Sequence, residues 1–315
     1  MHAVVFERKG GPEVLEYKEV DDPRPQEGAV VVDVEAVGVN YRDVYERTRP
    51  GYGADPPAVV GIEGAGTVAS SGERVAWVGV PGSYAEHAAA PRELLVPVPE
   101  GVSAQTAAAV LLQGMTAHYL ASDSYAIEAG DEVVVHSAAG GVGLLLTQLA
   151  KLRGGRVIAT TSTAEKAALA REAGADEVIG YEGFADRVRS LTGGDGAAAI
   201  YDGVGKATFL DGLKALRPLG RMILYGSPSG QPDPLDVAAL TAGSLYVQRP
   251  LLNTYVRTPE LLRERAGALF ELVASGRLDV RIGHRYPLAE ARRAHEDLEA
   301  RRTAGKLILL PGERS

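Results

Sequence analysis

The 315-residue sequence contains no cysteine, and this absence excludes several kinds of chemistry. Disulfide frameworks, thiolate zinc clusters, iron–sulfur centres and cysteine nucleophiles all need a thiol. An excess of positive charge is also missing, because 33 basic residues stand against 41 acidic ones and the formal net charge is −8. Since a dedicated nucleic-acid-binding protein usually carries a basic excess, we expect no nucleic-acid partner.

Long apolar runs are missing as well. The longest, such as AAAVLL at 107–112, fall well short of the roughly 20 residues that cross a bilayer. The N-terminal segment has no basic stretch followed by an apolar one, so it does not have the pattern of a secretory signal. We therefore expect a cytoplasmic protein with no membrane partner.

The pattern of apolar runs and turn residues changes along the chain and predicts two domains. The first hundred residues contain short valine-rich runs divided by Gly and Pro, a pattern typical of β-structure. Residues 131–250 alternate between apolar strands and helices, which predicts a doubly wound parallel sheet of six strands. The remaining helices and strand are too few to fold alone. We therefore expect a split β-rich domain, residues 1–113 and 252–315, with an α/β domain, residues 114–251, inserted in it.

The most specific motif is HSAAGGVG at 136–143, between an expected strand and an expected helix. It fits the dinucleotide-binding fingerprint, with Ala138 in the place of the first glycine and Gly140 and Gly143 in the other two. Gly141 and Val142 complete the turn. A backbone without side chains lets a pyrophosphate approach, and the N-terminus of the following helix favours its negative charge. The sequence therefore predicts a dinucleotide site.

The residues after the next strand favour NADPH over NADH. An NAD site usually has Asp or Glu there, to bind the ribose 2′-hydroxyl, whereas this sequence has Thr161, Ser162 and then Lys166. A hydroxyl and an ammonium suit a 2′-phosphate. The alternative for Lys166 is an ordinary solvated lysine. Tyr181, after the third strand, is expected either to contact the adenine or a phosphate or only to pack.

Four ordered motifs give the chain a resemblance to a known family. They are GVNYRDVYERTRPGY (38–52), PPAVVGIEGAGTV (56–68), HSAAGGVG (136–143) and LYVQRP (245–250). Together they resemble the quinone oxidoreductase (zeta-crystallin-like) family, in the zinc-free branch of the medium-chain dehydrogenase/reductase superfamily. The resemblance implies a GroES-like β-domain, a Rossmann domain, a cleft between them, NADPH, and electron transfer to quinones.

No metal is expected. Zinc-dependent relatives have a cysteine near the place of Asn40 and a histidine directly before Glu63, where this sequence has Ile62. An amide and an apolar side chain do not make an adequate zinc ligand set. His136, inside the strand-turn segment, is expected to be structural.

The resemblance also implies site residues. It places Asn40 and Tyr45 at the nicotinamide end of the cleft, as residues that orient the reactants. Tyr45 is expected either to donate a proton or to pack in the core. Cofactor contacts are further implied at Tyr125, Gly203, Tyr225, Gly226, Ser227, Val247, Arg249 and Arg301. Arg302 stands beside Arg301, so that assignment stays open between the two.

The activity we expect is zinc-independent transfer of a hydride or single electrons from NADPH to a quinone. One alternative is an NADPH-dependent enoyl or alkenal double-bond reductase, which would need a proton donor. Another is a non-catalytic, crystallin-like or RNA-binding protein that binds NADPH. The resemblance also implies a homodimer formed through the edge strand SLYVQRP (244–250).

Overall fold

The computed structural model describes residues 1–313, and the chain divides into two compact units. Unit 1 comprises residues 1–115 and the segment from Val256 onward, and unit 2 comprises Thr116–Tyr255. The first boundary lies within the helix α2 (Ala104–Tyr119). Within residues 1–313, no helix is both long and apolar enough to cross a membrane.

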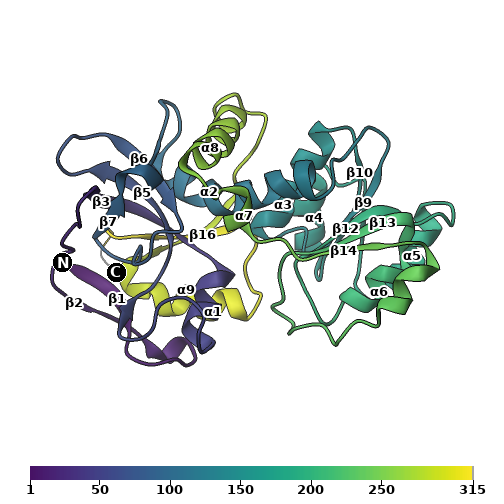
Figure 1. The fold of residues 1–315 in the computed structure, drawn as a ribbon, viewed down its shortest axis with the longest axis horizontal. Coiled ribbons are helices and arrows are strands. Elements are labelled where there is room, and N and C mark those ends of the chain that lie inside the picture. The colour runs from purple at the N-terminus through teal and green to yellow at the C-terminus, as the bar shows by residue number, and fades with distance from the viewer. Residues whose placement is uncertain (314–315) are drawn as a thin grey trace. The chain divides into compact units, whose positions relative to one another are not determined.

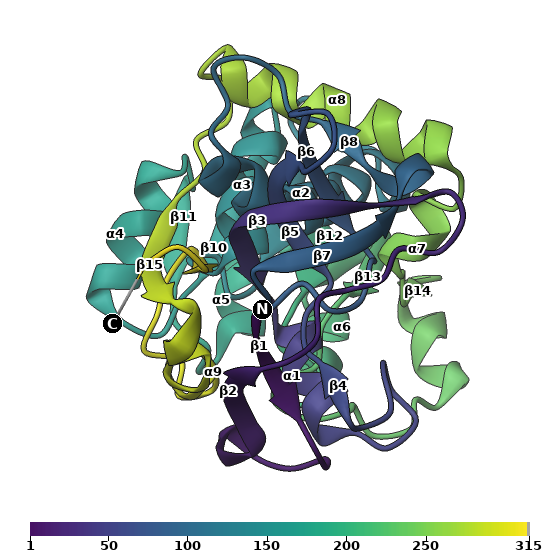
Figure 2. The ribbon, with the colours of Figure 1, turned by 90° about the vertical axis from the view of Figure 1, so that its left-hand side faces the viewer.

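Unit 1 is built mainly of antiparallel strands. Its strands are β1 (His2–Phe6), β2 (Leu15–Glu19), β3 (Ala29–Val39), β4 (Ala58–Val59), β5 (Glu63–Val68), β6 (Arg74–Val78), β7 (His87–Pro91), β8 (Val96–Pro97), β15 (Ile282–Pro287) and β16 (Lys306–Leu310). Its helices are α1 (Tyr41–Thr48), α8 (Pro259–Ala274) and α9 (Ala291–Glu299), with short 3-10 turns at Pro12–Val14, Arg92–Leu94 and Leu288–Glu290. One sheet has the order β2-β1-β4, and the other has the order β15-β16-β3-β5-β6-β8 with β7 also paired to β3. Figure 2 shows β1 and β2 side by side below β3.

The long strand β3 organises unit 1, because β5, β7 and β16 all pair with it in antiparallel register. Its inward side chains belong to a core that includes Trp77 and Tyr84, both fully buried. The pairing of β16 with β3 brings two distant parts of the chain together. It sets Leu307 opposite Val39, so Lys306 lies next to the start of α1 although 266 residues separate it from Asn40.

Unit 2 alternates strands and helices. Its strands are β9 (Glu132–Val135), β10 (Arg156–Thr160), β11 (Glu177–Ile179), β12 (Ala197–Asp202), β13 (Leu216–Leu224) and β14 (Tyr246–Gln248). Its helices are α3 (Gly141–Leu152), α4 (Ala164–Glu172), α5 (Phe184–Leu191), α6 (Phe209–Lys214) and α7 (Leu252–Tyr255), with a π-helix at Leu120–Ser124 and a 3-10 turn at Val237–Ala242.

All six strands of unit 2 are parallel, in the order β11-β10-β9-β12-β13-β14. This order reverses direction between β9 and β12, at the point where doubly wound folds bind dinucleotides. Figure 1 shows α3 and α4 on one face of the sheet and α5 and α6 on the other. The predicted fold class of this part of the chain is therefore confirmed.

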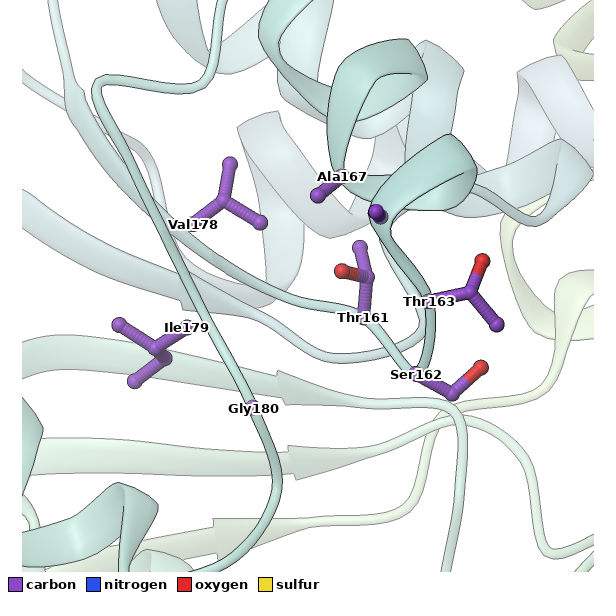
Figure 3. A pocket seen from close by; sticks show the side chains of 8 residues that line it. Thr161, Ser162, Thr163, Ala167, Val178, Ile179 and Gly180 are labelled. Carbon is purple, nitrogen blue, oxygen red and sulfur yellow. The ribbon is translucent and has the colours of Figure 1, made fainter.

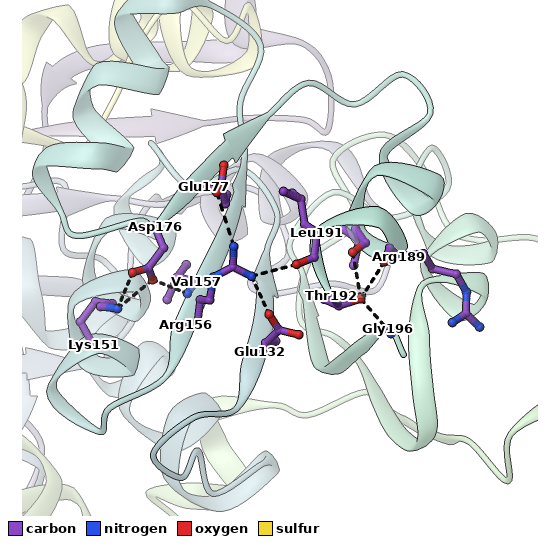
Figure 4. Close-up of polar contacts among 11 residues, drawn as sticks. Glu132, Lys151, Arg156, Val157, Asp176, Glu177, Arg189, Leu191, Thr192 and Gly196 are labelled. Atoms are coloured by element: carbon purple, nitrogen blue, oxygen red, sulfur yellow. Dashed lines mark hydrogen bonds and ion pairs between the residues drawn. The ribbon is translucent and has the colours of Figure 1, made fainter. Parts of the chain in front are cut away.

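Charged side chains hold the amino ends of these strands in register. Arg156 on β10 donates to Glu132 on β9 at 2.5 Å and to Glu177 on β11 at 3.4 Å, as Figure 4 shows. Lys151 and the backbone N–H of Val157 both donate to Asp176. These contacts occupy the edge opposite the carboxyl ends, which leaves the carboxyl edge for a ligand.

Candidate functional site

The turn between β9 and α3 has the geometry of a phosphate-binding turn. Ser137 adopts a positive φ of 54°, and the Gly140 N–H closes the turn on the Ser137 carbonyl at 2.9 Å. A Cβ on Gly143 would lie 2.4 Å from the Ser137 oxygen and 2.7 Å from the Cα of Ala138. Only glycine therefore lets α3 begin this close to the turn. The exposed N–H groups at the start of the helix suit a pyrophosphate.

Tyr181 and His136 frame this turn. The backbone N–H of Ser137 donates to the Tyr181 hydroxyl at 3.1 Å, so the phenol keeps its own proton for another acceptor. His136 is fully buried and bonds through Nδ1 to Thr160 at 2.8 Å. Burial lowers its pKa to about 3, so the imidazole is neutral at physiological pH. Tyr181 therefore lies beside the turn, and His136 is a buried structural residue that packs next to it.

A pocket of about 300 Å³ opens at the carboxyl ends of β10 and β11. Figure 3 shows its lining, in which Thr161 and Ser162 contribute hydroxyl groups. The other lining residues are Thr163, Ala164, Ala167, Val178, Ile179 and Gly180, and none of the lining residues is acidic. Lys166 lies in the first turn of α4, where its N–H donates to the Thr163 hydroxyl at 3.3 Å. A pocket with hydroxyl groups and no acidic lining residue fits a phosphorylated ribose better than a free 2′-hydroxyl.

A buried carboxylate organises the loop after β12. Asp202 accepts from the N–H groups of Val204 and Gly205 at 2.7 and 3.0 Å, and from the Thr208 hydroxyl at 2.8 Å. Its own carbonyl accepts from the N–H of Tyr225 at 2.9 Å. Gly203 has to be small, because a Cβ there would lie 2.5 Å from the Tyr225 hydroxyl oxygen. Asp202 therefore holds Gly203 and Tyr225 together, although the sequence pattern alone does not single it out.

The loop after β13 and the segment of β14 hold four more predicted cofactor residues. Ser227 is buried, and its hydroxyl accepts from Gln231 at 3.0 Å and from Arg249 at 3.4 Å. Gly226 precedes Ser227, and its N–H bonds to the Asp202 carbonyl at 3.3 Å. Val247 lies on the edge strand β14 with 38% of its surface exposed.

The Tyr125 hydroxyl lies apart from the other predicted cofactor residues of unit 2. Its hydroxyl donates to Asp131 at 2.8 Å and accepts from Arg217 at 3.1 Å. Asp131 precedes β9, and Arg217 is near the start of β13, so the phenol lies at the amino edge of the sheet. Burial and Asp131 together raise its pKa to about 12. The structure thus places the Tyr125 hydroxyl at the edge opposite the phosphate turn, and its expected cofactor contact stays a prediction.

In unit 1, Asn40 belongs to a buried polar network. Its amide Nδ2 donates to the Gly38 carbonyl at 3.1 Å and to Glu63 at 2.8 Å, and its Oδ1 accepts from Lys306 at 2.7 Å. Lys306 also donates to Glu63 at 2.7 Å. Asn40 is only 2% exposed. Both amide protons are therefore committed to Gly38 and Glu63. The expected place of Asn40 at the nicotinamide end of a cleft stays a prediction.

This network does not fit a zinc ion. Its donors are one amide and one carboxylate, and the Lys306 ammonium already binds both of them. Ile62 stands beside Glu63 without a ligand atom. Among residues 1–313, no group of three or more His, Cys, Asp or Glu side chains is arranged to hold a metal ion.

Tyr45 lies in a cluster of aromatic rings on unit 1. Its ring contacts those of Tyr41 and Tyr52 edge-on, with centroids 5.3 and 6.0 Å away. The guanidinium of Arg49 lies 3.6 Å from the Tyr45 ring centroid. Tyr45 is therefore partly buried within a surface cluster, and it does not belong to the interior core.

The two candidate arginines after α9 have different surroundings. Arg302 donates through Nε and Nη2 to Asp297 at 2.9 and 2.6 Å. Arg301 adopts a positive φ of 57°, which turns the chain out of the helix, and its charge acts on Tyr41. Arg302 is therefore held by a carboxylate, and which of the two arginines contacts the cofactor stays a prediction.

Two family models match the chain. The "Alcohol dehydrogenase GroES-like domain" model matches residues 26–100, and the "Zinc-binding dehydrogenase" model matches residues 141–267. The first match falls in unit 1, and most of the second falls in unit 2.

Among curated proteins, the quinone oxidoreductase of Pseudomonas aeruginosa is 41% identical over 98% of this chain and 99% of its own. The 2-haloacrylate reductase of a Burkholderia species is 37% identical, over 98% of both chains. Among solved structures, a mycobacterial protein complexed with NADPH has 46% identity and a TM-score of 0.95, over 99% of this chain and 100% of that one. The Escherichia coli quinone oxidoreductase complexed with NADPH also reaches 0.95, at 36% identity over the same shares.

The parallel sheet with its glycine-rich turn, placed in the chain between two parts of a GroES-like unit, defines a medium-chain dehydrogenase/reductase. Within that superfamily, identity over nearly the whole length shows that the chain belongs to the quinone oxidoreductase family.

Proposed function

We propose that this protein is an NADPH-dependent quinone oxidoreductase. The observation that carries the proposal is the carboxyl edge of unit 2, where the glycine-rich turn, the Tyr181 hydroxyl and a pocket without acidic lining residues follow one another. Its full-length similarity to a quinone oxidoreductase solved with NADPH supports the same assignment.

The residues of unit 2 fit the parts of NADPH. The N–H groups at the start of α3, with Gly140, Gly141, Val142 and Gly143, would hold the pyrophosphate. Ser162 and Lys166 would bind the 2′-phosphate, with Tyr181 between the two anionic groups. The loops at Gly203, Tyr225–Ser227 and Val247–Arg249 would border the rest of the cofactor, and the family resemblance implies a further contact at Arg301. When bound, NADPH supplies the hydride.

The proposed activity needs no metal ion. A quinone is already electrophilic, so the protein's task is to hold the acceptor beside the cofactor and to exclude water. In unit 1, the network of Asn40, Glu63 and Lys306 fixes the start of α1. That helix carries Tyr45, which we propose orients the acceptor.

The test is a panel of acceptors with NADPH. We expect turnover with 1,4-naphthoquinone and 9,10-phenanthrenequinone, weaker turnover with enones, and none with simple aldehydes. Turnover of enones and 2-haloacrylate above that of every quinone would instead favour the alternative below.

The alternative is an NADPH-dependent double-bond reductase. It is favoured by the similarity to the 2-haloacrylate reductase. That reaction needs a proton at the carbon next to the one that receives the hydride, and the Tyr45 hydroxyl would be its donor. If Tyr45→Phe keeps most of its activity on an enone, Tyr45 is not the proton donor.

We further propose that the protein is a cytoplasmic homodimer, formed through β14. This strand is the last in the order of its sheet, and Tyr246 and Val247 on it are 52% and 38% exposed. Leu219 and Leu251, also of unit 2, are 63% and 66% exposed. An edge strand with apolar neighbours favours pairing with a second copy about a two-fold axis.

A further inference from the structure

Unit 1 carries a tyrosine–arginine cluster made of Tyr41, Tyr45, Tyr52, Arg42 and Arg49. The three rings contact one another edge-on through Tyr45. Arg42 lies 5.6 Å from the centroid of Tyr52, and Arg49 lies 3.6 Å from that of Tyr45. All five residues come from α1 and the loop that follows it, so the cluster forms within one segment of the chain.

The two arginines differ in how their charges are compensated. Arg42 donates to the carboxylate of Glu46 at 2.6 Å, and this glutamate is buried. Arg47, on the same helix, is paired with Glu299. Within residues 1–313, the Arg49 guanidinium has no hydrogen-bond acceptor and no carboxylate partner, and it lies over the face of Tyr45.

The loop that carries Tyr52 is held in place by polar contacts. The Ala54 N–H donates to Glu46 at 2.8 Å. The Lys9 ammonium donates to the carbonyls of Glu46, Tyr52 and Ala54 at 2.7, 3.2 and 2.8 Å. A Cβ on Gly53 would lie 2.6 Å from the Glu46 side chain, so the loop lies directly against the helix. The arrangement of the rings is therefore fixed by the fold.

We propose that Arg49 determines acceptor specificity, by selecting planar quinones that carry an anionic substituent such as a sulfonate or carboxylate. This inference rests on the proposed function and names its substrate class. The tyrosine rings offer edges and faces against which a planar ring packs. A guanidinium that lies over a phenol is weakly hydrated, and its N–H donors point outward in the guanidinium plane, where two of them can bind one planar or tetrahedral anion.

The charge balance of the cluster supports an anion over a neutral acceptor. Arg42 and Arg47 are paired to glutamates, whereas the charge of Arg49 has no carboxylate partner within residues 1–313. Tyr41 and Tyr45 are half-buried while Tyr52 is exposed, so an anion bound beside Tyr41 and Tyr45 is screened less than in open solvent.

The test compares 1,4-naphthoquinone with 1,4-naphthoquinone-2-sulfonate in the full-length protein with NADPH. The quantity measured is the ratio of kcat/KM for the sulfonate to that for the neutral quinone, which removes effects common to both. We expect Arg49→Gln to lower this ratio about tenfold, the scale of one charge-assisted hydrogen-bond pair. Arg49→Lys keeps the charge without the planar stacked donors, so its ratio should lie between that of the parent protein and that of Arg49→Gln.

The matched control is Arg92→Gln, since Arg92 lies on the surface of unit 1 and pairs with Glu73 at 2.9 Å. It should leave the ratio as in the parent protein. Rising ionic strength should lower the ratio in the parent and have little effect in Arg49→Gln.

An unchanged ratio in Arg49→Gln, with circular dichroism showing a folded protein, would overturn the inference while leaving the proposed function intact. If the parent protein turns over neither quinone, the result would instead contradict the proposed function and, with it, this inference.

Discussion

At the scale of single residues, the buried ammonium of Lys306 explains why Asn40 and α1 hold their positions. Lys306 is 1% exposed and Glu63 is fully buried, so neither charge has water to stabilise it. Each charge therefore depends on the other and on the amide of Asn40. Gly38 leaves the space for this arrangement, because a Cβ there would lie 2.3 Å from the Glu63 carboxylate.

We predict that Lys306→Met lowers the free energy of unfolding by about 3–5 kcal/mol, because the Glu63 carboxylate would remain buried without a cation. Denaturant unfolding measures the change. The double variant Glu63→Gln/Lys306→Met should recover part of the loss, since it removes the uncompensated charge. Lys18→Met on the surface of β2 is the control, and a loss as small as that of the control would contradict the role of the pair.

The buried titratable groups predict how stability depends on pH. Burial lowers the pKa of His136 and His295 to about 3, from an ordinary 6.5. The unfolded chain binds these two protons first as the pH falls, so their contribution is complete above pH 6.5 and is lost toward pH 3. Burial raises the pKa of Asp43 from 3.8 to about 7. Its ionisation therefore destabilises the fold as the pH rises through that interval, opposite to the histidines.

Two variants separate these opposing effects between pH 4 and pH 6.5. His295→Gln removes a proton that binds only to the unfolded chain. The slope of the unfolding free energy against pH should therefore decrease by the amount that corresponds to about one bound proton. Asp43→Asn removes a proton that the folded state binds, so the rise should become steeper by about the same amount. Denaturant unfolding at a series of pH values measures both slopes. Parallel curves for all three proteins would refute the assignment.

At the scale of elements, the turn between β9 and α3 was predictable because its requirements are local. A strand, a glycine pattern and a helix follow one another in sequence, and each constrains the backbone within eight residues. The polar network around Asn40 was not predictable. It depends on the pairing of β16 with β3, and nothing in the sequence near Lys306 says which strand it joins.

The position of Tyr125 shows a second limit of sequence patterns. The alternation of strands and helices predicts the order of the sheet, but it does not say which edge a flanking side chain approaches. Tyr125 precedes β9, and Asp131 and Arg217 hold its hydroxyl at the amino edge. The Arg49 contact with Tyr45 was missed for a similar reason, because the helix end and the loop after it fix the side-chain direction.

Gly143→Ala tests the turn as an element. The added Cβ would lie 2.4 Å from the Ser137 oxygen, so the turn or the start of α3 has to shift. We predict a rise in the KM for NADPH of about tenfold or more, since losing one hydrogen bond to a charged phosphate costs about 1.5–3 kcal/mol. The control is Gly267→Ala, where a Cβ meets nothing within 4 Å on the helix α8.

Because alanine is the better helix former, Gly267→Ala should raise stability slightly and leave the KM as it is. An unaltered KM in Gly143→Ala would contradict the assignment of this turn to the cofactor.

At the scale of the whole molecule, each unit has its own hydrophobic core, and unit 2 ends in an exposed edge strand. Tyr246 on β14 is 52% exposed and packs against Arg221, whose guanidinium lies 5.2 Å from its ring centroid. A charged residue on an edge strand discourages pairing with another strand.

We therefore predict that Tyr246→Lys shifts the protein from dimer to monomer in analytical ultracentrifugation. Tyr17→Lys is the control, because Tyr17 is similarly exposed, at 41%, on β2 of unit 1. A parent protein that sediments as a monomer would contradict the proposed dimer, and an unshifted variant would place the interface elsewhere.

The most direct test of the whole account is the initial rate of NADPH oxidation by 1,4-naphthoquinone after exhaustive dialysis against a chelator, measured beside the same reaction with NADH. We predict that the dialysed protein keeps its full rate and that kcat/KM is higher for NADPH than for NADH. Loss of the rate on chelation with recovery on adding zinc, or a preference for NADH, would contradict it.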